Sequence, residues 1–270
     1  MIGRRATVRM RQLVETLGRV RTVIPLVLDR GVRRGPYCVR TWDGLRLWLR
    51  PGRGDRRGFY EVIVRGDYLA QGQVIRRGDT VIDVGANVGC FTVLAARMVG
   101  ASGRVIAFEP EPESFRQLVA NVEHNGLSNV TMRAVAIGRS NGTALLRTSG
   151  TALYSSTFES VDGRRNTGRP SEVQARTLET IMREMAVERC HYLKMDCEGS
   201  EYEIVESMSA DVAGRIDQIT LETHEVPGRS VHELSRRLGV LGFRLESGPL
   251  MYAARCGVSG EVPRQTPQTV

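Results

Sequence analysis

A short apolar run followed by two closely spaced glycines constrains this chain more than any other feature. Residues 80–84 read T-V-I-D-V, and a β-branched run of this kind fits a buried parallel strand with both faces covered. Gly85 and Gly89 then frame a turn whose backbone can lie close to a ligand. Residues 90–99 have the apolar spacing of a helix, which Gly100 ends. Strand, glycine turn and helix N-terminus together predict the ligand-binding edge of an open α/β sheet.

An acidic residue at the tip of the next predicted strand indicates that the ligand contains a nucleoside. Residues 104–108 (R-V-I-A-F) form a second apolar run, and Glu109 follows it, twenty positions beyond Gly89. A carboxylate at this place can accept hydrogen bonds from both hydroxyls of a ribose. The turn after Asp83 reads G-x-x-x-G, whereas a nicotinamide dinucleotide normally requires G-x-G-x-x-G, so the pattern is similar to that of S-adenosylmethionine-dependent methyltransferases. An ordinary tight turn with a surface acid is the alternative.

Length and composition fit one α/β domain with additions. The 270 residues can bury a sizeable core. We expect no transmembrane helix, because no apolar stretch approaches the ~20 residues that one requires. We recognise no secretory signal and therefore expect a cytoplasmic protein. The five cysteines form no C-x-x-C pair, which favours reduced thiols over disulfides or structural zinc.

Positive charge is concentrated near the N-terminus. Residues 1–78 contain 18 Arg and 6 acidic residues, a balance of +12, so the other residues balance at −4 within the total of +8. A basic segment can meet nucleic acid, an anionic membrane or an acidic substrate, although a solvated face is the simpler interpretation. Lys194 is the only lysine beside 37 arginines, which suggests that its position requires a lysine.

The chain divides into three predicted parts: an N-terminal extension (1–72), a ligand-binding domain (73–257) and a disordered tail (258–270). In the extension we predict an amphipathic helix over 4–28, a hairpin over 38–50 that turns at Asp43-Gly44, a loop over 51–55 and a helix over 59–69. The first helix could pack on the domain, cover a substrate entrance, lie on a membrane or mediate dimerisation. Assembly into a homo-oligomer is therefore one possibility.

Periodicity and stop signals predict the remaining elements of the domain. We expect strands at 130–137, 144–146, 173–176, 191–196, 216–224, 243–246 and 251–254, and helices that begin near 112, 178, 202 and 231. An adenine ring is expected to rest on residues 134–136. Residues 151–172, rich in Ser, Thr, Gly and Arg, are predicted to be a mobile lid, with a disordered loop as the alternative.

Charged residues follow two predicted strands, and we expect them to meet. Lys194, Asp196 and Glu198 lie at the end of one strand, while Glu222 and His224 lie at the end of the next. Charges beside a buried strand are costly unless they are paired or used. If the two strands are neighbours, these five side chains converge beside the glycine turn.

The motifs taken together resemble the FkbM family of S-adenosylmethionine-dependent methyltransferases. The likeness spans roughly residues 40–255 and includes D-V-G-A-N-V-G-C-F-T, F-E-P-E-P, A-V-A-I-G, T-L-E-T and L-K-M-D-C-E-G-S-E. It implies an α/β class I methyltransferase fold: a Rossmann-like, mostly parallel sheet of seven strands in the order 3-2-1-4-5-7-6, with helices on both faces. It also implies S-adenosyl-L-methionine as methyl donor and O-methylation of a sugar or natural-product hydroxyl, with N-methylation as the rarer alternative.

Candidate site residues follow from the motif and from the charged cluster. For the cofactor they are Asp83, Gly85, Asn87, Gly89, Glu109, Pro110, Ala136 and Asp196. For catalysis we expect His224 as general base, because imidazole titrates near neutral pH, with Asp196, Lys194 and Glu198 around it. A His224 that only satisfies hydrogen bonds is the alternative. Asp196, Glu222 and His224 could also hold a divalent ion such as Mg²⁺.

Two other functional classes compete with this hypothesis. A nucleic-acid methyltransferase would account for the basic charge, but base-modifying enzymes tend to carry [D/N]-P-P-[Y/F/W] where this chain has D-C-E-G, and aromatic residues make up only 6%. We therefore expect a small-molecule acceptor, such as a glycosylated metabolite, and no nucleic acid. The second class is a non-catalytic cofactor-binding protein that recruits a partner or membrane through its basic N-terminus.

Overall fold

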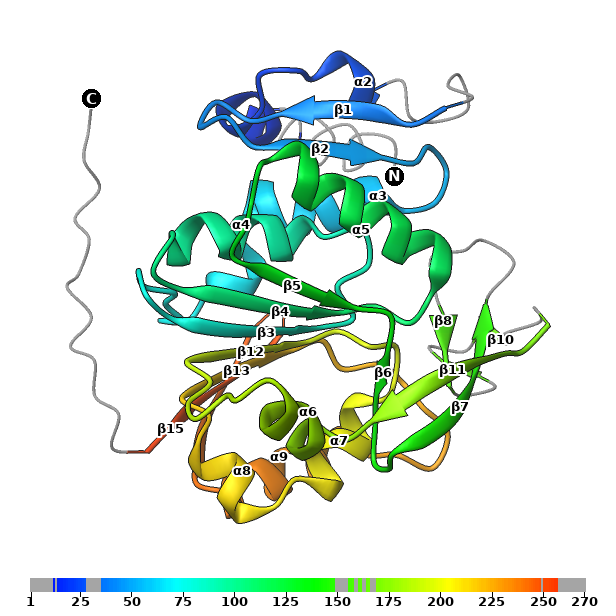
Figure 1. The fold of residues 1–270 in the computed structure, drawn as a ribbon, viewed down its shortest axis with the longest axis vertical. Helices are drawn as coiled ribbons and strands as arrows, with labels where there is room; N and C mark the ends of the chain where they lie inside the picture. Colours follow the sequence, from blue (N-terminus) through cyan, green and yellow to red (C-terminus); the bar gives the residue numbers. More distant parts are fainter. Residues whose placement is uncertain are drawn as a thin grey trace, which may run out of the picture.

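A seven-stranded mixed sheet forms the centre of the protein (Figure 1). The computed structural model describes residues 12, 14–27, 35–148, 155–157, 160–161, 164–165, 169–248 and 250–256. In spatial order the strands are β5 (Val130–Arg133), β4 (Arg104–Phe108), β3 (Thr80–Val84), β12 (Tyr192–Met195), β13 (Gln218–Leu221), β15 (Met251–Arg255) and β14 (Phe243–Ser247). The strand β15 runs antiparallel to both of its neighbours. This is the predicted order 3-2-1-4-5-7-6, and the class I methyltransferase fold is confirmed.

Alternating side chains of the strands divide the interior into two cores. Val81 and Val105 face one side together with α4 (Cys90–Val99) and α5 (Pro112–His124). Ile82 and Ile106 face the other side, which carries α6 (Leu178–Glu184), α7 (Glu201–Ser207), α8 (Ala210–Gly214) and α9 (Val231–Val240). Because both faces are covered (Figure 1), functional groups are confined to the ends of the strands.

The predicted strand over 130–137 is in fact two strands in two sheets. β5 stays in the central sheet, whereas β6 (Ala136–Ile137) pairs with β11 (Ser171–Arg176) in a second sheet completed by β7 (Gly142–Thr148) and β8 (Ser155–Ser156). The strands β9 (Ser160–Val161) and β10 (Arg164–Arg165) form a further pair. The split arises because β4 ends at Phe108, opposite Arg133, and leaves the following residues without a partner in the central sheet.

The N-terminal extension packs on the α4 and α5 side of the sheet. Its hairpin pairs β1 (Tyr37–Arg40) with β2 (Arg46–Leu49) as predicted, and Asn121 of α5 holds it by accepting from Trp48 N at 2.7 Å. The continuous helix predicted over 4–28 is wrong in its described part: residues 14–19 are helical, Val20 bridges to Thr41, and a new helix, α2, spans Ile24–Val27. At this point the backbone hydrogen-bonds to the hairpin instead: Arg21 N–H donates to the carbonyl oxygen of Arg40 at 2.7 Å, and Trp42 N–H donates to that of Arg19 at 3.1 Å.

The helix predicted over 59–69 begins earlier and changes its winding. α3 spans Asp55–Phe59, a π-helical turn (η1) covers Tyr60–Arg65 and a 3₁₀ turn (η2) covers Asp67–Leu69. Asp55 is the first residue of the helix and not part of the preceding loop, and its buried carboxylate pairs with Arg50 at 2.9 Å.

Several expectations concern segments that the structure describes only in part. Most of the predicted lid over 151–172 and the whole tail over 258–270 lie outside the described residues. All five cysteines are unpaired, as expected. Within the described ranges, every helix is too short or too polar to cross a bilayer.

Candidate active site

The glycine turn after β3 is shaped by contact with the loop after β12. Gly85 has a φ of 75°, and a Cβ at this position would lie 1.8 Å from the carbonyl oxygen of Asp196. Its backbone N–H and that of Ala86 both donate to the carbonyl oxygen of Phe108, at 3.0 and 2.9 Å. Only glycine fits here, because any side chain would push apart the carboxyl ends of two neighbouring strands.

Glu109 lies at the end of β4 and faces the same turn. Its Oε2 accepts from the backbone N–H of Asn87 at 2.7 Å, and its Oε1 accepts from that of Glu111 at 2.8 Å. Burial raises the pKa of Glu109 to about 7, although these two donors oppose the shift. A carboxylate has about four acceptor sites, so Glu109 can still accept from the two hydroxyls of a ribose.

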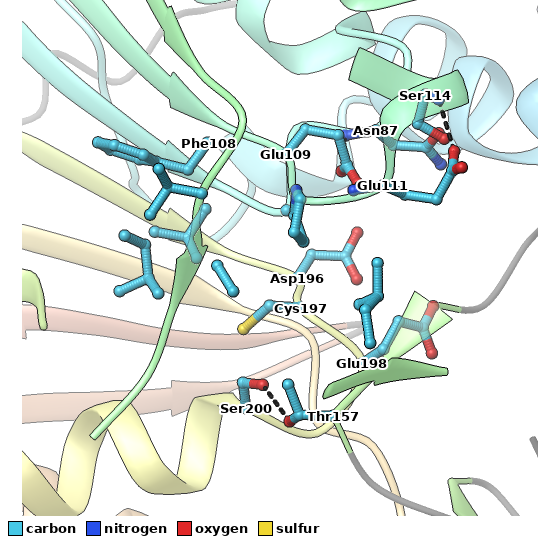
Figure 2. Close-up of a pocket in the computed structure, with 17 residues that line it drawn as sticks. Asn87, Phe108, Glu109, Glu111, Ser114, Thr157, Asp196, Cys197, Glu198 and Ser200 are labelled. Atoms are coloured by element: carbon cyan, nitrogen blue, oxygen red, sulfur yellow. Dashed lines mark hydrogen bonds between the residues drawn. The ribbon is translucent and has the colours of Figure 1, made fainter. Parts of the chain in front are cut away.

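A cavity lies over the carboxyl ends of β3, β4 and β12 (Figure 2). The lining comes from the glycine turn, from residues 108–111 with Ser114, from residues 135–137 with Leu146, and from residues 196–198 with Ser200. Thr157 closes one side, where its hydroxyl lies 3.2 Å from that of Ser200. The cavity therefore joins an apolar wall around Ala136 to polar groups at Glu109 and Asp196.

Lys194 is a buried anchor behind this cavity. Its Nζ donates to the carbonyl oxygen of Gly85 at 2.6 Å and lies 3.1 Å from Asp83 Oδ1 and 3.8 Å from Asp196 Oδ2. Burial alone would lower the pKa of Lys194, but the charges of Asp83 and Asp196 outweigh it and raise the pKa. Lys194 therefore stays charged and ties the glycine turn to β12.

Asp196 and Glu222 share the hydroxyl of Tyr68. The turn that carries Tyr68 is fastened to the sheet, since Tyr252 donates to the carbonyl oxygen of Asp67 at 2.6 Å. The Tyr68 hydroxyl donates to Asp196 Oδ2 at 2.8 Å and lies 3.5 Å from Glu222 Oε2. Burial and the two nearby carboxylates raise the pKa of Tyr68, so the hydroxyl keeps its proton and acts as a donor.

His224 is held among three acids and is itself buried. Its Nδ1 lies 3.1 Å from Glu201 Oε1, and its Nε2 lies 3.6 Å from Glu198 Oε2 and 3.8 Å from Asp196 Oδ1. Burial alone would lower the pKa of His224, but the hydrogen bond to Glu201 and the other carboxylates raise it to about 11. An imidazolium has no lone pair for another proton, and this geometry therefore opposes the expected role of general base.

The cluster does not fit a divalent ion well. The described residues whose ligand atoms lie within 4.8 Å of one another are Asp196, Glu201 and His224, so Glu222 is not part of the group. Both oxygens of Glu201 already accept backbone N–H groups of the preceding loop, at 2.7 and 2.8 Å. The Lys194 ammonium, 3.8 Å from Asp196 Oδ2, already places a positive charge beside the group. The expected metal set is not supported by this donor arrangement.

The structure places most of the predicted cofactor residues on the cavity and two of them behind it. The cavity is lined by Gly85, Asn87, Glu109, Pro110, Ala136 and Asp196, and also by Glu198. Asp83 is fully buried and pairs with Lys194, and Gly89 packs against Leu118, where a Cβ would lie 2.6 Å from Cδ1. These two residues support the turn from beneath.

The sequence motifs indicate no role for Glu201 or Tyr68. Glu201 is fully buried and holds both the loop after β12 and His224. An acid in the first turn of a helix is a weak signal, because such acids usually only complement the helix dipole. Tyr68 is 128 residues from Asp196, and no local pattern indicates that contact.

The strand order and the cavity at the strand ends define a class I, S-adenosylmethionine-dependent methyltransferase. A family model described as "Methyltransferase FkbM domain" matches residues 83–245. The chain belongs to this family.

Individual relatives share a modest sequence identity with this chain. The chain is 31% identical over 200 residues to a "31-O-demethyl-FK506 methyltransferase FkbM" of Streptomyces tacrolimicus, covering 63% of this chain and 75% of that protein. It is 24% identical to "Methyltransferase 1" of Beauveria bassiana, covering 55% and 66%. A solved FkbM methyltransferase from Methylobacillus flagellatus superimposes with a TM-score of 0.48 at 15% identity, covering 69% of this chain and 46% of that one.

Proposed function

We propose that this enzyme transfers a methyl group to a hydroxyl oxygen of a small molecule, a natural product or glycosylated metabolite. One relative supports the choice of oxygen, because its name gives an O-demethylated compound as acceptor. Amine methylation is the alternative outcome, which product analysis distinguishes.

The residues that line the cavity fit S-adenosylmethionine. Glu109 would accept from the ribose hydroxyls, and residues 135–137 would provide the apolar wall for the adenine. Asp196 would lie toward the methionine end, beyond the glycine turn. The cofactor, when bound, supplies an electrophilic methyl group on a sulfonium.

The main support for the proposal comes from the carboxylates of Asp196 and Glu222. A hydroxyl is a poor nucleophile at neutral pH unless a neighbouring group takes its proton. The side chains of Asp196 and Glu222 are 25% and 26% exposed, so an acceptor can reach both. α3 and η1 of the extension bring Arg57 and Glu61 to the same place, and we propose that this part of residues 1–72 forms a wall of the acceptor site.

A labelled-methyl transfer assay tests the function. The purified protein is incubated with methyl-labelled S-adenosylmethionine and a panel of hydroxylated and glycosylated natural products, and products are located by mass spectrometry. We expect label on oxygen, equal turnover with and without EDTA, and loss of transfer in Glu109→Gln. Glu172→Gln, on the exposed side of β11, is the matched control and should behave as wild type. Label found only on nitrogen would contradict the proposal.

A further inference from the structure

Four titratable groups surround the place where an acceptor hydroxyl would lose its proton. They differ in access: the side chains of Asp196 and Glu222 are 25% and 26% exposed, that of Glu198 is 16% exposed and that of His224 only 3%. A general base must come within hydrogen-bond reach of the proton that it takes. Access therefore favours Asp196 and Glu222.

Asp196 is held by three close partners. Its Oδ2 accepts from Tyr68 at 2.8 Å and faces the Lys194 ammonium at 3.8 Å, while its Oδ1 lies 3.8 Å from His224. These three partners already engage both carboxylate oxygens, which leaves them less available to an acceptor hydroxyl. Its place on the cavity wall suits contact with the methyl donor instead.

Glu198 and His224 are unsuitable for a second reason. Burial raises the pKa of Glu198 to about 9, with Asp196, Glu201 and Glu222 adding to the shift, so its carboxyl group is protonated at neutral pH. His224 carries its proton as well. Neither group can therefore accept the proton of a hydroxyl.

Glu222 is about as exposed as Asp196, and its side chain lies farther from its partners. It follows directly after β13, and its backbone N–H donates to the carbonyl oxygen of Met195 at 3.0 Å, which fixes it beside the strand that leads to Asp196. Its Oε2 lies 3.5 Å from the Tyr68 hydroxyl, and its Oε1 lies 3.7 Å from Arg57 Nη2. We propose that Glu222 is the group that takes the proton from the acceptor hydroxyl, with Tyr68 and Arg57 as positioning residues.

The charged surroundings of Glu222 agree with this role. Asp196 and His224 face it from the ends of β12 and β13, Glu61 and Arg57 face it from η1 and α3, and Tyr68 faces it from η2. Burial and the charge of Asp196 raise the pKa of Glu222 to about 7, while His224 and Arg57 oppose the shift. A base works best when its pKa lies near the working pH.

The proposed step balances as a group transfer. The O–H bond of the acceptor breaks and its proton goes to a carboxylate oxygen of Glu222. The electron pair left on the acceptor oxygen forms the new O–CH₃ bond, and the S–CH₃ bond breaks with its pair remaining on sulfur. Glu222 then returns the proton to water. This inference rests on the proposed function, because it names the proton acceptor of that same reaction.

The test compares Glu222→Gln, Tyr68→Phe and the surface control Glu172→Gln. Wild type is first assayed to establish that the product is O-methylated. Each variant is then measured for turnover against pH, for S-adenosylmethionine affinity by calorimetry and for thermal unfolding. For Glu222→Gln we expect turnover to fall by about 10²- to 10⁴-fold, cofactor affinity to stay within about twofold and the rise of turnover with pH near neutrality to disappear. For Tyr68→Phe we expect a smaller fall and a shifted pH profile, since the hydroxyl is lost but the ring remains.

The outcomes separate the two proposals. A wild type that binds the cofactor but methylates no hydroxyl overturns the proposed function. An O-methylating wild type whose folded Glu222→Gln variant keeps turnover within about threefold, with an unchanged pH profile, overturns the assignment of Glu222 alone.

Discussion

The ammonium of Lys194 donates to the carbonyl oxygen of Gly85 at 2.6 Å, and so a buried cation of β12 holds the turn that begins after β3. The same ammonium lies 3.1 Å from Asp83, whose carboxylate is fully buried. The only lysine of the chain is thus used for support rather than for contact with an acceptor.

Replacing Lys194 by Met should destabilise the protein strongly. Asp83 would remain as a buried carboxylate without its cation, a loss of about 3–5 kcal/mol in the free energy of unfolding. Chemical denaturation of the variant and the wild type measures this loss in the free energy of unfolding. The double variant Lys194→Met/Asp83→Asn should recover part of the loss, because the uncompensated charge is gone. Equal stabilities of the single variant and the wild type would refute the anchoring role.

Gly85→Ala should abolish cofactor binding, because the new methyl group would lie 1.8 Å from the carbonyl oxygen of Asp196. Gly126→Ala is the matched control: its φ of 62° is also positive, but its Cβ would meet no atom within 4 Å. The control isolates the backbone strain of a positive φ, about 1–3 kcal/mol, from the clash. Calorimetry with S-adenosylmethionine should show no heat for the first variant and normal heat for the second. Normal binding by Gly85→Ala would mean that the two loops need not touch.

Cofactor affinity should depend on pH through Glu109. Only the ionised carboxylate accepts from both ribose hydroxyls, and burial raises the pKa of this group to about 7 in the free protein. Affinity should therefore rise with pH, by roughly tenfold between about pH 6 and about pH 8. Titration calorimetry at several pH values measures the slope, which Glu109→Gln should flatten. A slope that persists in the variant would assign the effect to another group.

His224 should stabilise the folded protein as a cation. Its pKa is raised from 6.5 to about 11 in the folded state, so its stabilising contribution is complete below about pH 6.5 and is lost as pH rises toward 11. His224→Gln should lower the melting temperature most below that window and should flatten its decline at alkaline pH. Melting curves of both proteins across the pH range provide the comparison. Parallel curves would mean that His224 is neutral in the fold.

Local patterns in the sequence are enough to predict most strands of the sheet and the glycine turn. The run that ends at Val84, the glycines after it and Glu109 lie within thirty residues of one another, and strand order follows from the family resemblance. The chemistry of the acid cluster could not be predicted in the same way. Whether His224 is a base or a fixed cation depends on Glu201 and on burial, and neither is encoded in the spacing of the two residues.

Long-range contacts explain the other differences. Tyr68 reaches Asp196 only because Tyr192 and Tyr252 fasten its turn to the sheet. The strand predicted over 130–137 splits because β4 ends at Phe108, opposite Arg133. Ala136 pairs instead with β11, which lies far along the chain. Periodicity identifies a strand but does not say which sheet receives it.

A crystal structure with S-adenosylhomocysteine would show where the nucleoside and the sulfur lie relative to Glu109 and Asp196. We expect the ribose hydroxyls on the Glu109 carboxylate, the adenine against residues 135–137 and the sulfur directed toward Asp196 and its neighbours Tyr68 and Glu222. A nucleoside bound elsewhere, or a sulfur directed away from these three side chains, would contradict it.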